Sequence, residues 1–186
     1  MRLLSYSTDA GPAFGLVSAD ESGVVDLVKR LRGVENLGDL VEQERIGDAR
    51  TFVNEPPDHP MADIVHERLL PRPGKIFCIG VNYANRNAEY KDGSEAPTNP
   101  SVFLRTPDSL TAHGSPLIRP PESHQLDYEG EIVVVIGKGG RRIKEEDAFE
   151  HIAGLSIMNE GTLRDWVRHA KFNVTQGKNF VHSGSI

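Results

Sequence analysis

The stretch Leu126–Gly137, LDYEGEIVVVIG, constrains the fold of this chain more than any other. Its residues from Ile132 to Ile136 are all β-branched, which favours a strand. An apolar run without alternation predicts a strand that is buried on both faces. Because strand side chains repeat with a period of two, Glu129 and Glu131 should share one face. Two anions on that face repel each other unless a cation joins them.

The glutamate pair alone leaves two interpretations open, since either residue can also face water or pair with an arginine. Glu160 closes a second apolar stretch and adds a third carboxylate, although it also suits the start of a helix over GTLRDW. Three carboxylates without clustered His or Cys favour Mg²⁺, Mn²⁺ or Ca²⁺ over Zn²⁺. Lys178, in QGKNF, is either a positive charge opposite this metal or a solvated surface lysine.

Composition excludes several classes of protein. The 186 residues carry a net charge of -6 with no basic tract, which argues against a nucleic-acid partner. The single cysteine, Cys78, rules out an internal disulfide and is typical of a reducing compartment; we interpret it as a small core residue. Because no stretch has the length of a membrane span or the pattern of a signal peptide, we expect a cytoplasmic protein without membrane contact.

The order of the predicted elements indicates an α+β fold with a mainly antiparallel or mixed sheet. Residues 1–70 are expected to form a small β-rich unit, and residues 71–186 a second unit. Strands are expected at Arg2–Ser7, Ala13–Ser18, Gly23–Leu27, Lys75–Val81, Ser101–Arg105 and Ala153–Met158. Helices are expected at 26–33, 37–44, 84–90, 143–151 and 161–169, with Pro-rich connectors at 55–60 and 69–74. The polar loop 91–100 is either a lid or a plain surface loop.

Five motifs occur in an order that matches a known family. They are KIFCIGVNY from Lys75, SVFLRTPDSL from Ser101, LDYEGEIVVVIGKGGR from Leu126, NEGTLRDW from Asn159 and QGKNF from Gln176. The chain resembles the fumarylacetoacetate hydrolase family, in the bacterial branch of 2-hydroxyhepta-2,4-diene-1,7-dioate isomerases and 5-oxopent-3-ene-1,2,5-tricarboxylate decarboxylases. The resemblance implies a small N-terminal domain, then part of the family's mixed β-roll, and assembly as a homodimer.

The resemblance also implies roles for individual residues. Glu129 and Glu131 match the family's Glu-x-Glu metal ligands, and Glu160 matches the third carboxylate, which is usually Asp. The implied cofactor is Mg²⁺ or Mn²⁺. Lys178 matches a lysine that faces the substrate. Tyr83 and Arg105 lie in segments that line the family's substrate pocket.

One departure from the family pattern bears on the reaction. Arg86 stands where the family's hydrolases carry a histidine that activates water, while Glu89 keeps the position of its glutamate partner. Arginine stays protonated and cannot act as a general base, so we expect Arg86 to pair with Glu89 or to bind a substrate carboxylate.

The resemblance therefore implies an enzyme that isomerises or decarboxylates a small 2-oxo acid or diacid of aromatic catabolism. Glu89 and Lys178 are its candidate catalytic residues. Hydrolysis of an acylpyruvate C–C bond is the second expectation. Family members extend past the QGKNF motif well beyond the position of Ile186. A truncated or degenerate non-catalytic homologue is therefore the third expectation.

Overall fold

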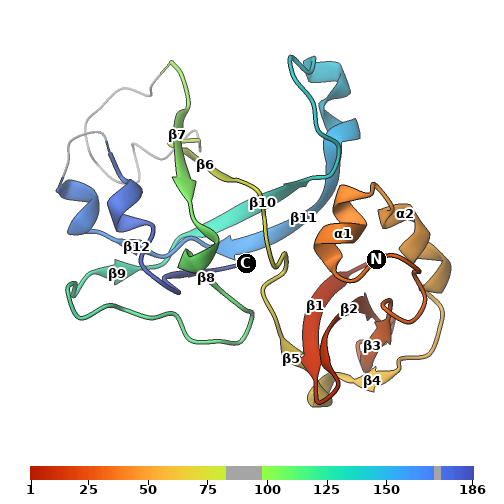
Figure 1. The fold of residues 1–186 in the computed structure, drawn as a ribbon. Helices are drawn as coiled ribbons and strands as arrows, with labels where there is room; N and C mark the ends of the chain where they lie inside the picture. The colour runs from red at the N-terminus through yellow and green to blue at the C-terminus, as the bar shows by residue number, and fades with distance from the viewer. Residues whose placement is uncertain (83–97, 170–172) are drawn as a thin grey trace.

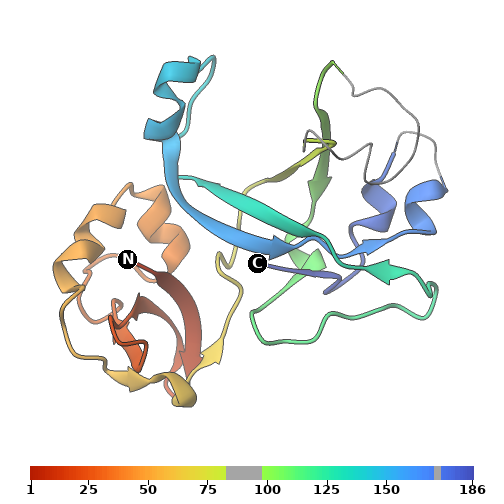
Figure 2. The same ribbon diagram turned by 180° about the vertical axis from the view of Figure 1, so that it is seen from behind.

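The computed structural model describes residues 1–82, 98–169 and 173–186, and it is mostly β (Figures 1 and 2). Residues 3–66 supply a five-stranded antiparallel sheet in the order β4-β3-β2-β1-β5. Its strands are β1 (Leu3–Thr8), β2 (Gly11–Val17), β3 (Gly23–Asp26), β4 (His59–Pro60) and β5 (Val65–His66). The helices α1 (Leu37–Glu42) and α2 (Ile46–Ala49) lie beside this sheet in both views.

The remaining strands form three sheets. A four-stranded sheet has the order β10-β11-β13-β8, and the pairs β12-β9 and β6-β7 are separate. The strands are β6 (Ile76–Gly80), β7 (Ser101–Arg105), β8 (Leu110–Thr111), β9 (Leu126–Asp127), β10 (Gly130–Ile136), β11 (Ile152–Asn159), β12 (Thr162–Leu163) and β13 (Gly184–Ser185). Short 3-10 helices cover 50–52, 61–63, 107–109, 145–151, 166–168 and 175–177. No helix in the described part of the chain is long and apolar enough to cross a membrane.

The main hydrophobic core lies in the N-terminal sheet. Phe14, Leu16 and Val25 point from β2 and β3 toward Leu37 and Leu40 of α1, and all five side chains are buried. The side chain of Asn36 caps α1 by accepting a hydrogen bond from the Asp39 amide at 3.1 Å. The predicted strands of this unit and the helix after residue 37 are therefore confirmed, while a domain boundary at residue 70 stays a prediction.

Three predicted helices differ from the structure. The helix over 26–33 is wrong because the Asp26 carboxylate accepts the Val28 and Lys29 amides, which makes a turn instead. The stretch 143–151 holds only a 3-10 helix over 145–151. The helix over 161–169 is also wrong: Thr162 and Leu163 pair with β9, and a 3-10 helix follows at 166–168. The predicted helix 84–90 and most of the loop 91–100 lie outside the described residues.

The prediction that β10 is buried on both faces is wrong. β10 pairs antiparallel with β11 but forms the edge of its sheet, and its side chains alternate between exposed and half-buried. The exposed apolar face comprises Ile132, Val134, Ile136, Leu155 and Ile157. An exposed apolar patch over an edge strand favours association with another polypeptide.

Replacing Ile157, which is 79% exposed, by Lys should leave the free energy of unfolding in urea within about 0.5 kcal/mol of wild type. The same change should lower the fluorescence of a bound hydrophobic dye. The control is Leu163→Lys, which buries a charge and should cost more than about 3 kcal/mol. If Ile157→Lys were equally destabilising, the exposed face would be covered in solution.

A charged network joins β3 to the segment before β4. Arg30 donates to Glu55 and to Asp58, both at 2.6 Å, and Asp58 also accepts the Asp26 amide at 2.8 Å. Burial opposes the ionisation of Asp58, but the hydrogen bonds from Asp26 and Arg30 outweigh it and lower the pKa of this carboxyl. The network therefore stabilises the N-terminal sheet when Asp58 is charged.

Asp58→Asn should lower the free energy of unfolding by about 1–2 kcal/mol at pH 7, because it removes the charge that Arg30 pairs with. A lowered folded-state pKa adds stability above the unfolded-state pKa, and this stability is lost as the pH falls through the folded value. The difference in the free energy of unfolding between wild type and Asp58→Asn, measured by urea titration, should therefore become smaller below about pH 4. A gap that stayed constant down to pH 2 would contradict this account.

Candidate metal centre

The three glutamates converge at the junction of two neighbouring strands. Glu129 and Glu131 flank Gly130 at the start of β10, and Glu160 follows the last residue of β11. The antiparallel register pairs Glu131 with Met158, and the Glu160 amide donates to the Glu129 carbonyl at 2.8 Å. One carboxylate oxygen from each glutamate lies within 4.8 Å of the others. The structure thus brings together the trio predicted from sequence.

Two cations offset the repulsion within this trio. The ammonium of Lys178, whose side chain is 5% exposed, donates to Glu129 Oε2 at 2.7 Å and to Glu160 Oε2 at 3.2 Å. Lys178 is therefore not the solvated surface lysine that was the alternative. Arg164 lies on the other side of the same carboxylate and contacts Glu129 Oε1 at 2.7 Å and Asp127 at 3.0 Å.

Arg164 is the residue that sequence reasoning missed. It belongs to the NEGTLRDW motif and follows Glu160 by four residues. Because Leu163 pairs with Leu126 in the β12–β9 ladder, the next residue is carried next to Asp127 and Glu129. The only sequence feature that could have indicated Arg164 was its place in the NEGTLRDW motif, which already contained the predicted ligand Glu160.

The donor set fits a divalent cation. Glu160 is 4% exposed, and its Oε1 is buried with no hydrogen-bond partner among the described residues. A buried carboxylate oxygen left without a partner is costly, and a cation within reach removes that cost. The trio offers oxygen ligands only, which suits Mg²⁺ or Mn²⁺. No other group of three His, Cys, Asp or Glu side chains gathers this closely in the described part of the chain.

Two further residues lie close to Glu160: Arg105, which was predicted as a site residue, and Cys78, which was interpreted as a small core residue. Arg105, at the end of β7, is 3% exposed and donates to Ser109, Gly161 and Ser183. Cys78 of β6 is half-buried and close to Glu160. Burial raises the pKa of its thiol, and the Glu160 carboxylate raises this pKa further. A protonated thiol is a poor nucleophile.

Three predicted site residues cannot be placed. Tyr83, Arg86 and Glu89 lie outside the described residues. Their roles therefore stay predictions. Among the described candidates, the three glutamates lie together and Lys178 donates hydrogen bonds to two of them. Arg105 lies close to Glu160.

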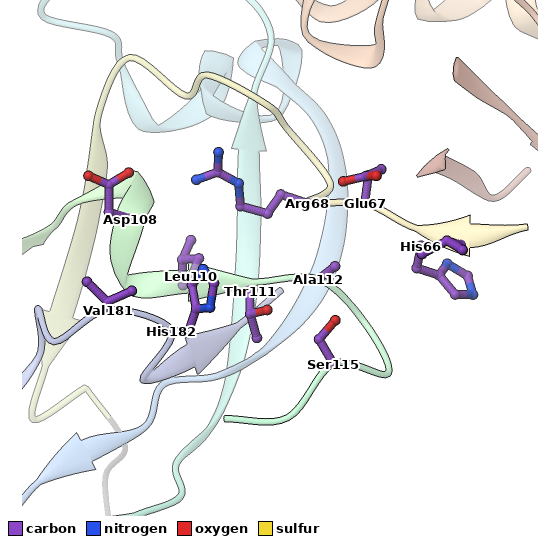
Figure 3. Close-up of a pocket in the computed structure, with 11 residues that line it drawn as sticks. His66, Glu67, Arg68, Asp108, Leu110, Thr111, Ala112, Ser115, Val181 and His182 are labelled. Atoms are coloured by element: carbon purple, nitrogen blue, oxygen red, sulfur yellow. The ribbon is translucent and has the colours of Figure 1, made fainter. Parts of the chain in front are cut away.

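A separate cavity of about 510 Å³ lies away from the trio, between the segment after β5 and strand β8 (Figure 3). His66 and Arg68 line one side, and Asp108, Thr111 and His182 line the other. None of the predicted site residues lines it. The Arg68 guanidinium donates to the Pro107 carbonyl at 2.9 Å, so it joins the N-terminal sheet to the rest of the chain.

Together, the fold and the trio define a mostly β protein with a cluster of three carboxylates whose oxygen atoms suit a divalent cation. Residues 75–186 match the family described as the fumarylacetoacetate (FAA) hydrolase C-terminal family, and the chain belongs to it. The resemblance drawn from the motifs is therefore confirmed.

Three known proteins illustrate the likeness. Oxaloacetate tautomerase YisK of Bacillus subtilis (strain 168) is 40% identical over 129 residues, which are 63% of this chain and 42% of the relative. A homoprotocatechuate catabolism bifunctional isomerase/decarboxylase of Escherichia coli is 38% identical over 101 residues, or 54% of this chain and 23% of the relative. A fumarylacetoacetate hydrolase structure from Exiguobacterium antarcticum superposes with a TM-score of 0.80 at 26% identity, covering 99% of this chain and 64% of that chain. The chain thus spans about half or less of these two curated relatives.

We expect Mg²⁺ or Mn²⁺ at millimolar concentration to raise the melting temperature, because a ligand that binds only the folded state stabilises it by mass action. In Glu131→Gln this rise should be lost, since a neutral amide is a weak ligand for a hard cation. The measurement is a thermal melt with and without metal. The matched control is Glu146→Gln, an exposed acid paired with Lys144, which should keep the full rise. If neither metal raised the melting temperature of the wild type, the trio would bind no cation.

Proposed function

We propose that this chain is the metal-binding part of an enzyme that isomerises or decarboxylates a small 2-oxo acid or diacid of aromatic catabolism. The observation that carries the proposal is the convergence of three glutamates with Lys178 at one strand junction. The relatives support it, because the bacterial ones are named as a tautomerase and as an isomerase/decarboxylase. These reactions share an enolate of the substrate.

The glutamates have the first role in this proposal. Glu129, Glu131 and Glu160 would hold Mg²⁺ or Mn²⁺ through one oxygen each. Such a cation, when bound, acts as a Lewis acid that favours the enolate of a 2-oxo acid. Glu131 is held by its pairing in the β10–β11 ladder, and the backbone hydrogen bond from Glu160 to Glu129 joins the two residues that flank this ladder, which keeps the trio preorganised.

Lys178 has the second role. Its ammonium lies within hydrogen-bond distance of two of the three carboxylates, so it borders any anion that binds at the trio. There it would donate a hydrogen bond to a substrate oxygen and stabilise the negative charge that develops on it. Glu89 is our proposed proton acceptor at the substrate carbon, and Arg86 and Tyr83 are proposed to bind the substrate.

Two alternatives remain as proposals. Hydrolysis of an acylpyruvate C–C bond is favoured by the likeness to a solved structure named as a fumarylacetoacetate hydrolase. It needs an activated water, for which Arg86 is unsuited as a base. A non-catalytic homologue is the other alternative, and the preserved trio argues against it. We also propose that the chain assembles as a homodimer, as the family resemblance implies.

Lys178→Met should keep or tighten metal binding, because the ammonium competes with a divalent cation for Glu129 and Glu160. It should lower kcat by about 100-fold or more, since it removes a donor aimed at developing charge. Metal titration and steady-state rates measure the two effects. Lys138→Met, which removes an exposed lysine near Glu150, is the control and should change neither. Loss of metal binding in Lys178→Met would show that the lysine serves the centre itself.

The reaction is assigned by following oxaloacetate and an acylpyruvate in parallel with Mn²⁺ present. Loss of the enol absorbance without pyruvate indicates tautomerisation, pyruvate with CO₂ indicates decarboxylation, and acid release from the acylpyruvate indicates hydrolysis. Glu131→Gln at the same metal concentration corrects for catalysis by free metal. If wild type and Glu131→Gln gave equal rates on both substrates, the enzymatic proposal would fail for this chain.

A further inference from the structure

The guanidinium of Arg105 is a buried positive charge, and its hydrogen bonds to the described residues go to neutral groups. Nε donates to Ser109 Oγ at 3.1 Å, and the two terminal nitrogens donate to the Gly161 carbonyl at 3.1 Å and to Ser183 Oγ at 3.0 Å. No carboxylate of the described residues lies within ion-pair distance of it. Burying a charge is costly, so the position of this guanidinium among neutral acceptors of the described chain calls for an explanation.

Burial lowers the pKa of Arg105, and two carboxylates of the trio act against this shift. Glu160 has the largest stabilising effect on the Arg105 cation, and Glu129 also contributes. The hydrogen bond to Gly161 holds the backbone of the residue next to Glu160. Arg105 therefore reaches the metal centre through the chain that carries one of its ligands.

The surrounding backbone leaves little freedom at this point. A Cβ atom on Gly161 would lie 1.8 Å from the Ser183 carbonyl, and one on Gly184 would lie 2.8 Å from the Arg105 guanidinium. The end of β11 and the segment before β13 are thus pressed together, with the guanidinium bonded to both. Its planar fork can bridge several acceptors at once, which a lysine ammonium on a flexible stem does less well.

We propose that Arg105 is a positioning residue that fixes Glu160 for metal binding, by bridging the ends of β7 and β11 and the segment before β13. The proposal rests on the metal centre of the proposed function. Groups that orient metal ligands typically change metal affinity by about 10- to 100-fold when they are replaced. Arg105 acts through Glu160, whereas the family resemblance implied a residue lining the substrate pocket.

The test uses two measurements on the full chain. The first is the affinity for Mn²⁺, measured by calorimetry without substrate. The second is the KM for the substrate, measured at saturating Mn²⁺. Arg105→Lys should weaken Mn²⁺ binding about tenfold or more and leave KM unchanged. Arg105→Met should weaken it further. The matched control is Arg68→Met. This variant removes a guanidinium that donates a hydrogen bond to the Pro107 carbonyl and does not contact the trio, so it should bind Mn²⁺ like wild type.

Ser183→Ala keeps the charge and removes one acceptor of the guanidinium, so it decides the matter if the Arg105 variants do not fold. It should weaken Mn²⁺ binding measurably, but less than Arg105→Lys does. Unchanged Mn²⁺ affinity in the folded variants would overturn the proposal. A raised KM with unchanged affinity would overturn it too and would make Arg105 a substrate contact. If wild type bound no Mn²⁺, the metal-dependent function itself would fail, which is a distinct result.

Discussion

Electrostatic repulsion among three glutamates is the constraint on which the centre of this structure depends. Their ligand oxygens lie within 4.8 Å of one another, and Glu160 is almost fully buried. Such an arrangement is unstable unless cations offset it. Lys178 and Arg164 do so by contacting opposite oxygens of Glu129, and Lys178 also reaches Glu160. The positive charges are therefore as much a part of the centre as the acids.

Strand pairing, rather than side-chain packing, sets the geometry of that centre. The β10–β11 register carries Glu131 opposite Met158 and brings the Glu160 amide onto the Glu129 carbonyl. A shift of one residue would turn Glu131 to the other face of the sheet. The exposed apolar side chains of the same two strands show that this sheet is held by its ladder of hydrogen bonds while one face remains uncovered.

The predictions from sequence were right where local pattern decides the structure. The strands around β1, β2, β6, β7 and β11 follow from apolar and β-branched runs, and the helix after residue 37 follows from its spacing. They were wrong where a side chain competed for backbone groups. Asp26 took the amides that a helix over 26–33 would have used. Thr162 and Leu163 pair with β9, and no local sequence pattern predicts this pairing.

By itself, the sequence determined the residue types of the site: three carboxylates, a lysine, and the motifs of the fumarylacetoacetate hydrolase family, which residues 75–186 match. Residue type and spacing within one strand contain that information. Only the tertiary structure decided which charges face one another. It placed Lys178 between Glu129 and Glu160, added Arg164, and buried Arg105 behind Glu160. These contacts join residues far apart in the chain, and their distances are set by the register and packing of whole strands, which spacing along the sequence does not encode.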